Sequence, residues 1–259
     1  NFYRADMIGA GLEFESIEVL GGVESNPPEL VSMSMTPATG VMDVSVSDQV
    51  LQVIVDASDE SGVDWNNSNL SIRAEGNRLF YFDSDAESPG TFSLTLTSES
   101  TSGLWTFEAL ILRDVNGLQA NFYRADMIGA GLEFESIEVV EGFNFDLDRD
   151  GSSKALTDGL LLIRKLFGFS GSALTNGSVG ELSKRETPSQ ILNYLTFYST
   201  ELDIDGDGES KALTDGLLLI RYLFGFSGNS LTGGAIGEGA ERETAEEIQA
   251  YIRERVSGE

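Results

Sequence analysis

The sequence predicts a mixed fold class with two domains, an all-β sandwich followed by an all-α module. Short runs of alternating apolar residues fill the first half, as expected of strands with one buried face. From Phe143 onward, helical patterns bounded by glycine replace them, and they occur twice at a spacing of 57 residues. A chain of 259 residues with 41% hydrophobic residues is long enough for two cores. We therefore expect a β-sandwich over 23–141 and a helical module over 142–259.

The composition is strongly acidic and excludes several classes of function. Asp and Glu number 43 against 16 Lys and Arg, which gives a formal charge of -27. Such a charge disfavours nucleic acid as a partner. The chain has no histidine and no cysteine, which removes His-dependent triads, thiolate chemistry, typical zinc sites and disulfides. Hard cations with oxygen ligands remain possible, and we do not expect an enzyme.

Residues 1–19 repeat residues 121–139 letter for letter. This identity predicts that 1–22 are the C-terminal strands of a preceding repeat, and that the chain is a piece of a longer tandem array. We expect the first segment to pair along a sheet edge by strand addition. No apolar run approaches the roughly 20 residues needed to cross a bilayer, and the start lacks the pattern of a signal peptide.

The β-rich half contains nine candidate strands separated by turn signals such as "EGN", "SPG" and "VNG". In one of them, Trp105, Phe107, Ala109 and Ile111 alternate with more polar positions and should share a buried face. Seven to nine short strands of this kind resemble an immunoglobulin-like sandwich. The candidate strands lie at 30–35, 41–47, 50–57, 70–74, 79–82, 91–97, 104–115, 120–124 and 132–140.

Each copy of the helical repeat contains two helices. The first is apolar almost all round, "LLLIRKLFGF" in one copy and "LLLIRYLFGF" in the other. The second begins with a capping box, Thr187 with Gln190 and Thr244 with Glu247, and Pro188 occupies a first helical position where its missing N–H costs nothing. Apolar residues behind both boxes follow one helical face.

An aspartate loop precedes each apolar helix. In the first loop, carboxylates stand at positions 1, 3 and 5, followed by glycine at position 6, and the second loop repeats this order. Calcium binds six to eight oxygens, and the EF-hand loop supplies them in this order, with a backbone carbonyl at position 7. The predicted ligands of the first loop are Asp146, Asp148, Asp150, Ser152 through its carbonyl, and Asp158. Those of the second loop are Asp203, Asp205, Asp207, Glu209 through its carbonyl, and Asp215.

The end of each loop departs from the EF-hand pattern. Position 12 is Thr157 or Thr214, and the closing aspartate follows one residue later. We interpret this as a loop that is one residue longer, with the threonine as helix N-cap and the aspartate in the first turn. Asp-Gly clusters also serve as simple turns and solubility devices. Two copies at a fixed spacing, each with a helix and a trailing aspartate, favour two calcium ions.

The duplicated pattern D-x-D-x-D-G-x-x-x-A-L-T-D-G-L-L-L-I-R resembles the type I dockerin family. That resemblance covers 143 to about 256 and implies an EF-hand-like calcium-binding module that docks onto cohesin domains in extracellular assemblies. It implies cohesin recognition through Ala155, Leu156, Ala212 and Leu213. The 57-residue repeat is longer than the compact unit of that family.

The expected function is therefore calcium-dependent and non-catalytic, in a secreted or cell-surface multidomain protein. The partner would be a cohesin-like domain or a neighbouring repeat of the same protein. An alternative is a carbohydrate-binding module in which Trp65, Tyr81 and Trp105 form a platform for polysaccharide and calcium only stabilises. A passive stalk is a third possibility. None of these readings involves insertion into a membrane.

Overall fold

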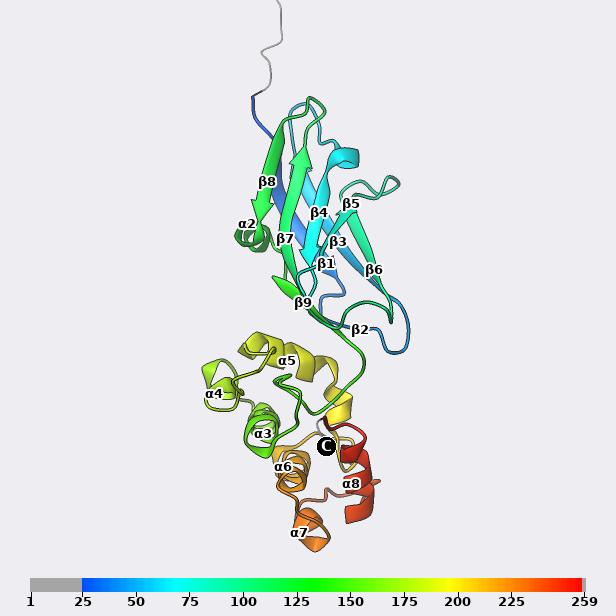
Figure 1. Ribbon diagram of the computed structural model, residues 1–259, viewed down its shortest axis with the longest axis vertical. Helices are drawn as coiled ribbons and strands as arrows, with labels where there is room; N and C mark the ends of the chain where they lie inside the picture. The colour runs from blue at the N-terminus through cyan, green and yellow to red at the C-terminus, as the bar shows by residue number, and fades with distance from the viewer. Residues whose placement is uncertain (1–24, 258–259) are drawn as a thin grey trace, which may run out of the picture.

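The computed structural model describes residues 25–257 and places a β-rich part end to end with a stack of short helices (Figure 1). The β-rich part ends at Val140, and the helical part follows without a long linker. The predicted strands of a preceding repeat, at 1–22, lie outside the described residues, as does the edge pairing expected of them.

Two sheets form the β-rich part. The smaller has the order β1-β3-β6, and the larger has the order β2-β9-β7-β4-β5 with β8 also paired to β7. Strand pairs are antiparallel except for β2 and β9, which run parallel. The strands are β1 (Glu29–Thr36), β2 (Val41–Asp43), β3 (Gln49–Ser58), β4 (Asn69–Arg73), β5 (Leu79–Asp83), β6 (Thr91–Leu96), β7 (Gly103–Arg113), β8 (Gln119–Tyr123) and β9 (Ser136–Val140).

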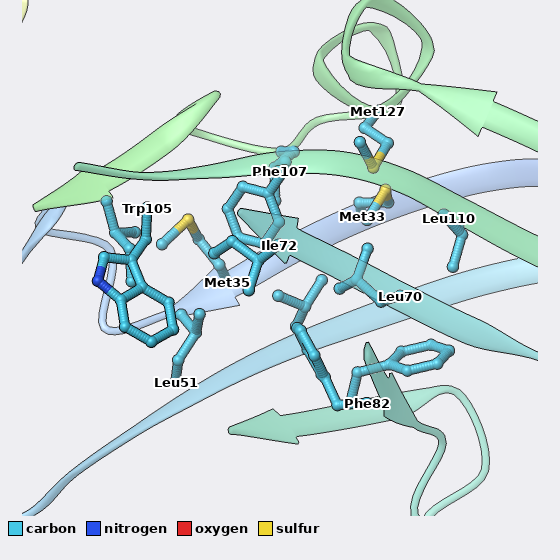
Figure 2. Close-up of a cluster of buried hydrophobic side chains, with 14 of the residues drawn as sticks. Met33, Met35, Leu51, Leu70, Ile72, Phe82, Trp105, Phe107, Leu110 and Met127 are labelled. Atoms are coloured by element: carbon cyan, nitrogen blue, oxygen red, sulfur yellow. The ribbon is translucent and has the colours of Figure 1, made fainter. Parts of the chain in front are cut away.

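The inward faces of both sheets meet in one apolar core. Figure 2 shows Leu51 of β3 together with Leu70 and Ile72 of β4 and Phe107 of β7 in this core. All four side chains are fully buried. Alternation along the strands places them there, because successive side chains of a strand point to opposite faces.

The predicted buried face of β7 is correct only for its first half. Trp105 and Phe107 are buried, but Ala109 and Ile111 are half-exposed, and Leu110 is buried instead. The pairing of β7 with β4 shifts register at this point. A shift of one residue exchanges the two faces of a strand, and strict alternation along the sequence does not reveal it.

The helical part contains two similar repeats. Each begins with a π-helical turn that leads into an apolar helix, continues through a one-turn helix, and ends with a longer helix that starts at a predicted capping box. Both capping boxes and Pro188 at the helix start are confirmed. The helices are α3 (Leu160–Leu166), α4 (Ser172–Thr175) and α5 (Pro188–Phe197) in the first repeat, and α6 (Leu217–Leu223), α7 (Asn229–Thr232) and α8 (Ala245–Arg253) in the second.

The predicted division into an all-β and an all-α domain is wrong. Helix and strand take 27% and 26% of the structure, and the β-rich part contains helix α2 (Arg124–Gly129), which begins at the end of the candidate strand 120–124 and lies in the connection before the candidate strand 132–140. The second part is not an all-α module, because its short helices are joined by long loops and its core takes in Val41 of β2 and Val140 of β9. Helices this short are not stable alone, so tertiary packing decides where they form.

Candidate metal centres

Each aspartate loop gathers three carboxylates. One oxygen from each of Asp146, Asp148 and Asp150 lies within 4.8 Å of the others. In the second loop the group consists of Asp203, Asp205 and Asp215. Among the described residues these are the groups of acidic side chains close enough to share a metal ion. The structure thus brings together six of the residues that the sequence predicted as ligands.

Backbone amides hold the first carboxylate of each loop in place. Asp146 accepts hydrogen bonds from the N–H of Asp150 at 3.0 Å and of Gly151 at 2.8 Å. Asp203 accepts the equivalent bonds from Asp207 at 3.1 Å and Gly208 at 2.9 Å, and a further bond from the N–H of Gly206 at 2.8 Å. Gly151 has a φ of 94°, and this left-handed conformation allows the sharp turn predicted at position 6.

Asp158 and Asp215 close their loops from the helical side. Asp158 is fully buried, and its carboxylate accepts hydrogen bonds from the N–H of Leu147 at 2.6 Å and of Lys154 at 2.8 Å. Asp215 makes the same contacts 57 residues later. Each carboxylate therefore ties the start of its loop to the start of the following helix.

The predicted threonine N-caps are wrong. The helical turns begin three residues earlier, with Lys154 and Lys211 as N-caps. Thr157 lies inside the turn and donates its hydroxyl proton to Asp158. The aspartate, four residues beyond the N-cap, satisfies the free amide at the helix start, and this leaves the threonine no capping role.

Lysine ammonium groups face the fifth position of each loop. Lys154 contacts Asp150 Oδ2, and Lys211 Nζ lies 3.3 Å from Asp207 Oδ2. The remaining predicted ligands are placed through their amides: the N–H of Ser152 donates to Asp150, and that of Glu209 donates to Asp207. The assignment of their carbonyl oxygens as ligands stays a prediction.

Two pairs of residues that sequence analysis missed complete the loops. The N–H of Gly180 donates to Asp148 Oδ2 at 2.7 Å, and Gly237 donates to Asp205 in the same way. A Cβ at Gly180 would lie 2.8 Å from Asp150 Oδ2. Arg185 and Arg242 donate to backbone carbonyls of the loops. Their shared 57-residue spacing was the available signal.

Burial and repulsion from neighbouring carboxylates raise the pKa values of three loop aspartates, Asp146, Asp158 and Asp205. Burial raises the pKa of Asp158 to about 6, although hydrogen bonds from Lys154 and Thr157 oppose the shift. Burial also raises the pKa values of Asp146 and Asp205. Carboxylates in this state suit a divalent cation, because the cation neutralises the charge that burial penalises.

The residues that the dockerin resemblance implied for cohesin recognition divide into two kinds. Leu156 and Leu213 are 67% and 66% exposed, whereas Ala155 and Ala212 are buried. The aromatic residues considered for a sugar platform do not share a face. Trp105 is buried, Trp65 packs against Phe92, and Tyr81 points outward from β5, on the side opposite Phe80 and Phe82.

Comparisons with known proteins assign this chain to no family. No protein-family model and no curated protein matches the chain. Among solved structures, CopC from Methylosinus trichosporium OB3b matches with 17% identity and a TM-score of 0.25, over 37% of this chain and 86% of that chain. No helix in the described part is both long and apolar enough to span a membrane.

The raised pKa of Asp158 predicts how metal-free stability depends on pH. The folded state binds the Asp158 proton more tightly than the unfolded state does. Ionisation of Asp158 therefore destabilises the folded state above pH 6, and this cost is relieved as the pH falls. We expect the free energy of unfolding in chelator to rise by about 1–2 kcal/mol from pH 7.5 to pH 5. Denaturant titrations at these pH values measure it. A stability that increases with pH over this range would contradict the prediction.

The close approach of Gly180 predicts a local effect of a single methyl group. We expect Gly180→Ala to push the Asp150 carboxylate aside and lower divalent-cation affinity about tenfold, which calorimetric titration would detect. Gly129→Ala in α2 is the matched control, because its Cβ would meet no neighbouring atom. Equal affinities for both variants would show that Gly180 does not shape the loop.

Proposed function

We propose that this chain is a calcium-binding, non-catalytic region of a secreted or cell-surface multidomain protein, and that its repeated loops bind two calcium ions. The observation that carries the proposal is the duplicated cage, in which three carboxylate oxygens lie within 4.8 Å of one another in each of two loops. An isolated acidic turn is common on protein surfaces, but a cage repeated with the same hydrogen bonds is not.

The donor set favours calcium over other metals. The candidate ligands are carboxylates and backbone carbonyls, which hard cations prefer, and the chain has no histidine or cysteine for softer metals. Magnesium requires a compact octahedron with several retained waters, whereas loops that offer several carboxylates and carbonyls suit the larger and more variable calcium shell. Millimolar extracellular calcium fits a location outside the cell.

Calcium would supply the positive charge that the loops lack. Asp146, Asp148 and Asp150 would hold it in the first loop, and Asp203, Asp205 and Asp215 in the second. Asp158 and Asp215 orient the loop backbone against the π-helical turn. Neutralising the carboxylates would therefore strengthen the attachment of α3 and α6 to their loops.

We further propose that the helical part docks onto a cohesin-like protein partner. Exposed Leu156 and Leu213 support this, because each stands at the start of the turn that follows a candidate calcium loop. Large apolar side chains in equivalent exposed positions of two repeats suit a protein contact whose shape depends on the bound ions.

Calorimetric calcium titration tests the metal proposal. We expect two ions per wild-type chain and one per chain in either Asp148→Ala or Asp205→Ala, because each variant removes a buried carboxylate from one cage. Asp59→Ala is the control: this aspartate accepts bonds from Ser61 and Gly62 in an acidic turn of the β-rich part. Wild-type protein that binds no calcium, or a loss of ions in the control, would refute the assignment.

Binding to a purified type I cohesin domain tests the docking proposal. In calcium, we expect the double variant Leu156→Asp, Leu213→Asp to lower affinity at least about tenfold, because charge replaces exposed apolar contact surface. Leu182→Asp is the control, since Leu182 is also exposed but lies outside both turns. Wild-type protein that does not bind, or equal loss in the control, would count against docking through these leucines.

A further inference from the structure

The two candidate calcium loops have matching internal contacts but different surroundings. The first loop lies beside the β-rich part, and the second belongs to the more distant repeat (Figure 1). Four side chains of the first repeat make polar contacts with the β-rich part. They are Arg149, Lys184, Arg185 and Tyr198.

Glu75, which follows β4, forms ion pairs with two basic side chains at the first loop. Its carboxylate lies 2.5 Å from Arg149 Nη1 and 2.5 Å from Lys184 Nζ, and Arg149 also donates to the carbonyl of Ser102. Arg149 is position 4 of the loop, between two predicted ligands. Burial opposes ionisation of Glu75, but the hydrogen bonds from Lys184 and Arg149 outweigh it and lower the pKa of this carboxyl.

Arg185 forms a second connection, deep in the joint. Its guanidinium binds both carboxylate oxygens of Glu138 in β9, at 2.6 and 2.9 Å, and it stacks on the ring of Tyr194 at 3.7 Å. The same group donates to the carbonyls of Asp146 and Leu147, and its backbone N–H donates to Asp148. One buried arginine thus holds the ligand-bearing backbone against the sheet.

The second loop lacks these connections. Gly206 and Glu241 stand where the first repeat has Arg149 and Lys184. Arg242, the counterpart of Arg185, donates to the carbonyls of Asp203 and Ile204 and stacks on Tyr251. Within the described residues it has no carboxylate at ion-pair distance. A Cβ at position 206 would lie 3.0 Å from Arg242 Nη2 and 3.1 Å from Glu241 Cβ, a close approach that the glycine avoids.

We propose that the first loop locks the joint between the β-rich part and the helical part: a divalent cation bound there and the packing of the two parts stabilise each other, while the second loop binds its cation independently. This inference rests on the proposed metal binding. The coupling has a physical origin: Glu75 pairs with Arg149 and Lys184, and without it these two positive charges would be free to pair with the loop carboxylates that the metal ion needs. Binding linkage is reciprocal, so each event strengthens the other by the same factor.

Loop-specific titrations test one direction of the coupling, with calcium alone as the probe and the whole chain as the sample. Asp205→Ala leaves the first loop intact, and Asp148→Ala leaves the second. Adding Glu75→Gln should weaken calcium binding about fivefold to twentyfold in the Asp205→Ala variant and less than about twofold in the Asp148→Ala variant. Calcium still bound by the second loop shows that the variant is folded. Equal effects in both backgrounds would overturn the coupling.

Distance measurements test the other direction. The chain has no cysteine, so spin labels attach only at introduced cysteines. Labels on Glu99→Cys in the β-rich part and Ala173→Cys in the helical part, both exposed positions, measure the distance between the two parts. We expect a distance distribution that is broad in chelator and narrow in calcium. It should stay broad with Asp148→Ala and become narrow with Asp205→Ala. If the distance distribution of Asp148→Ala also narrows in calcium, the coupling is refuted although calcium still binds. If no calcium binds to wild-type protein, the metal proposal itself fails.

Discussion

Repulsion between buried carboxylates is the constraint on which the helical part depends. Each loop places three acidic oxygens within 4.8 Å of one another, and each contains a fourth aspartate, Asp158 in the first loop and Asp207 in the second. Two charges about 4 Å apart repel by roughly 1 kcal/mol in water and several times more when desolvated. Backbone amides and two lysines offset part of this repulsion. A bound dication would neutralise the charge that they leave uncompensated.

The two repeats show how one sequence pattern acquires two environments. Their loops share the same hydrogen bonds to aspartate, glycine and arginine. Among the ion pairs of the described residues, those that reach the β-rich part come from the first repeat: Arg149 and Lys184 pair with Glu75, and Arg185 pairs with Glu138. Breaking a buried ion pair on one side leaves a costly unpaired charge. Glu138 and Arg185 therefore link the sheet and the first loop energetically.

Local signals predicted much of the candidate site. The spacing of Asp146, Asp148 and Asp150 implied that they converge, and the capping boxes located the starts of α5 and α8. The prediction failed where hydrogen bonding or strand pairing in the folded chain overrides a sequence preference. Thr157 is the predicted N-cap, but Lys154 occupies that position, and its amide donates to the buried carboxylate of Asp158. Alternation along β7 missed a register shift that arises only from its pairing with β4.

The sequence by itself determined the local chemistry: acidic loops repeated at 57 residues, capped helices and alternating strands, all set by neighbours close in the chain. Tertiary structure alone decided which groups come together across the chain. It placed Gly180 beside Asp148, Arg185 beside Glu138, and Val41 and Val140 in the core of the helical part. It also replaced the expected all-α module with short helices packed against two strands. The reason is physical, because short helices and close-set charges persist only when distant residues bury and neutralise them.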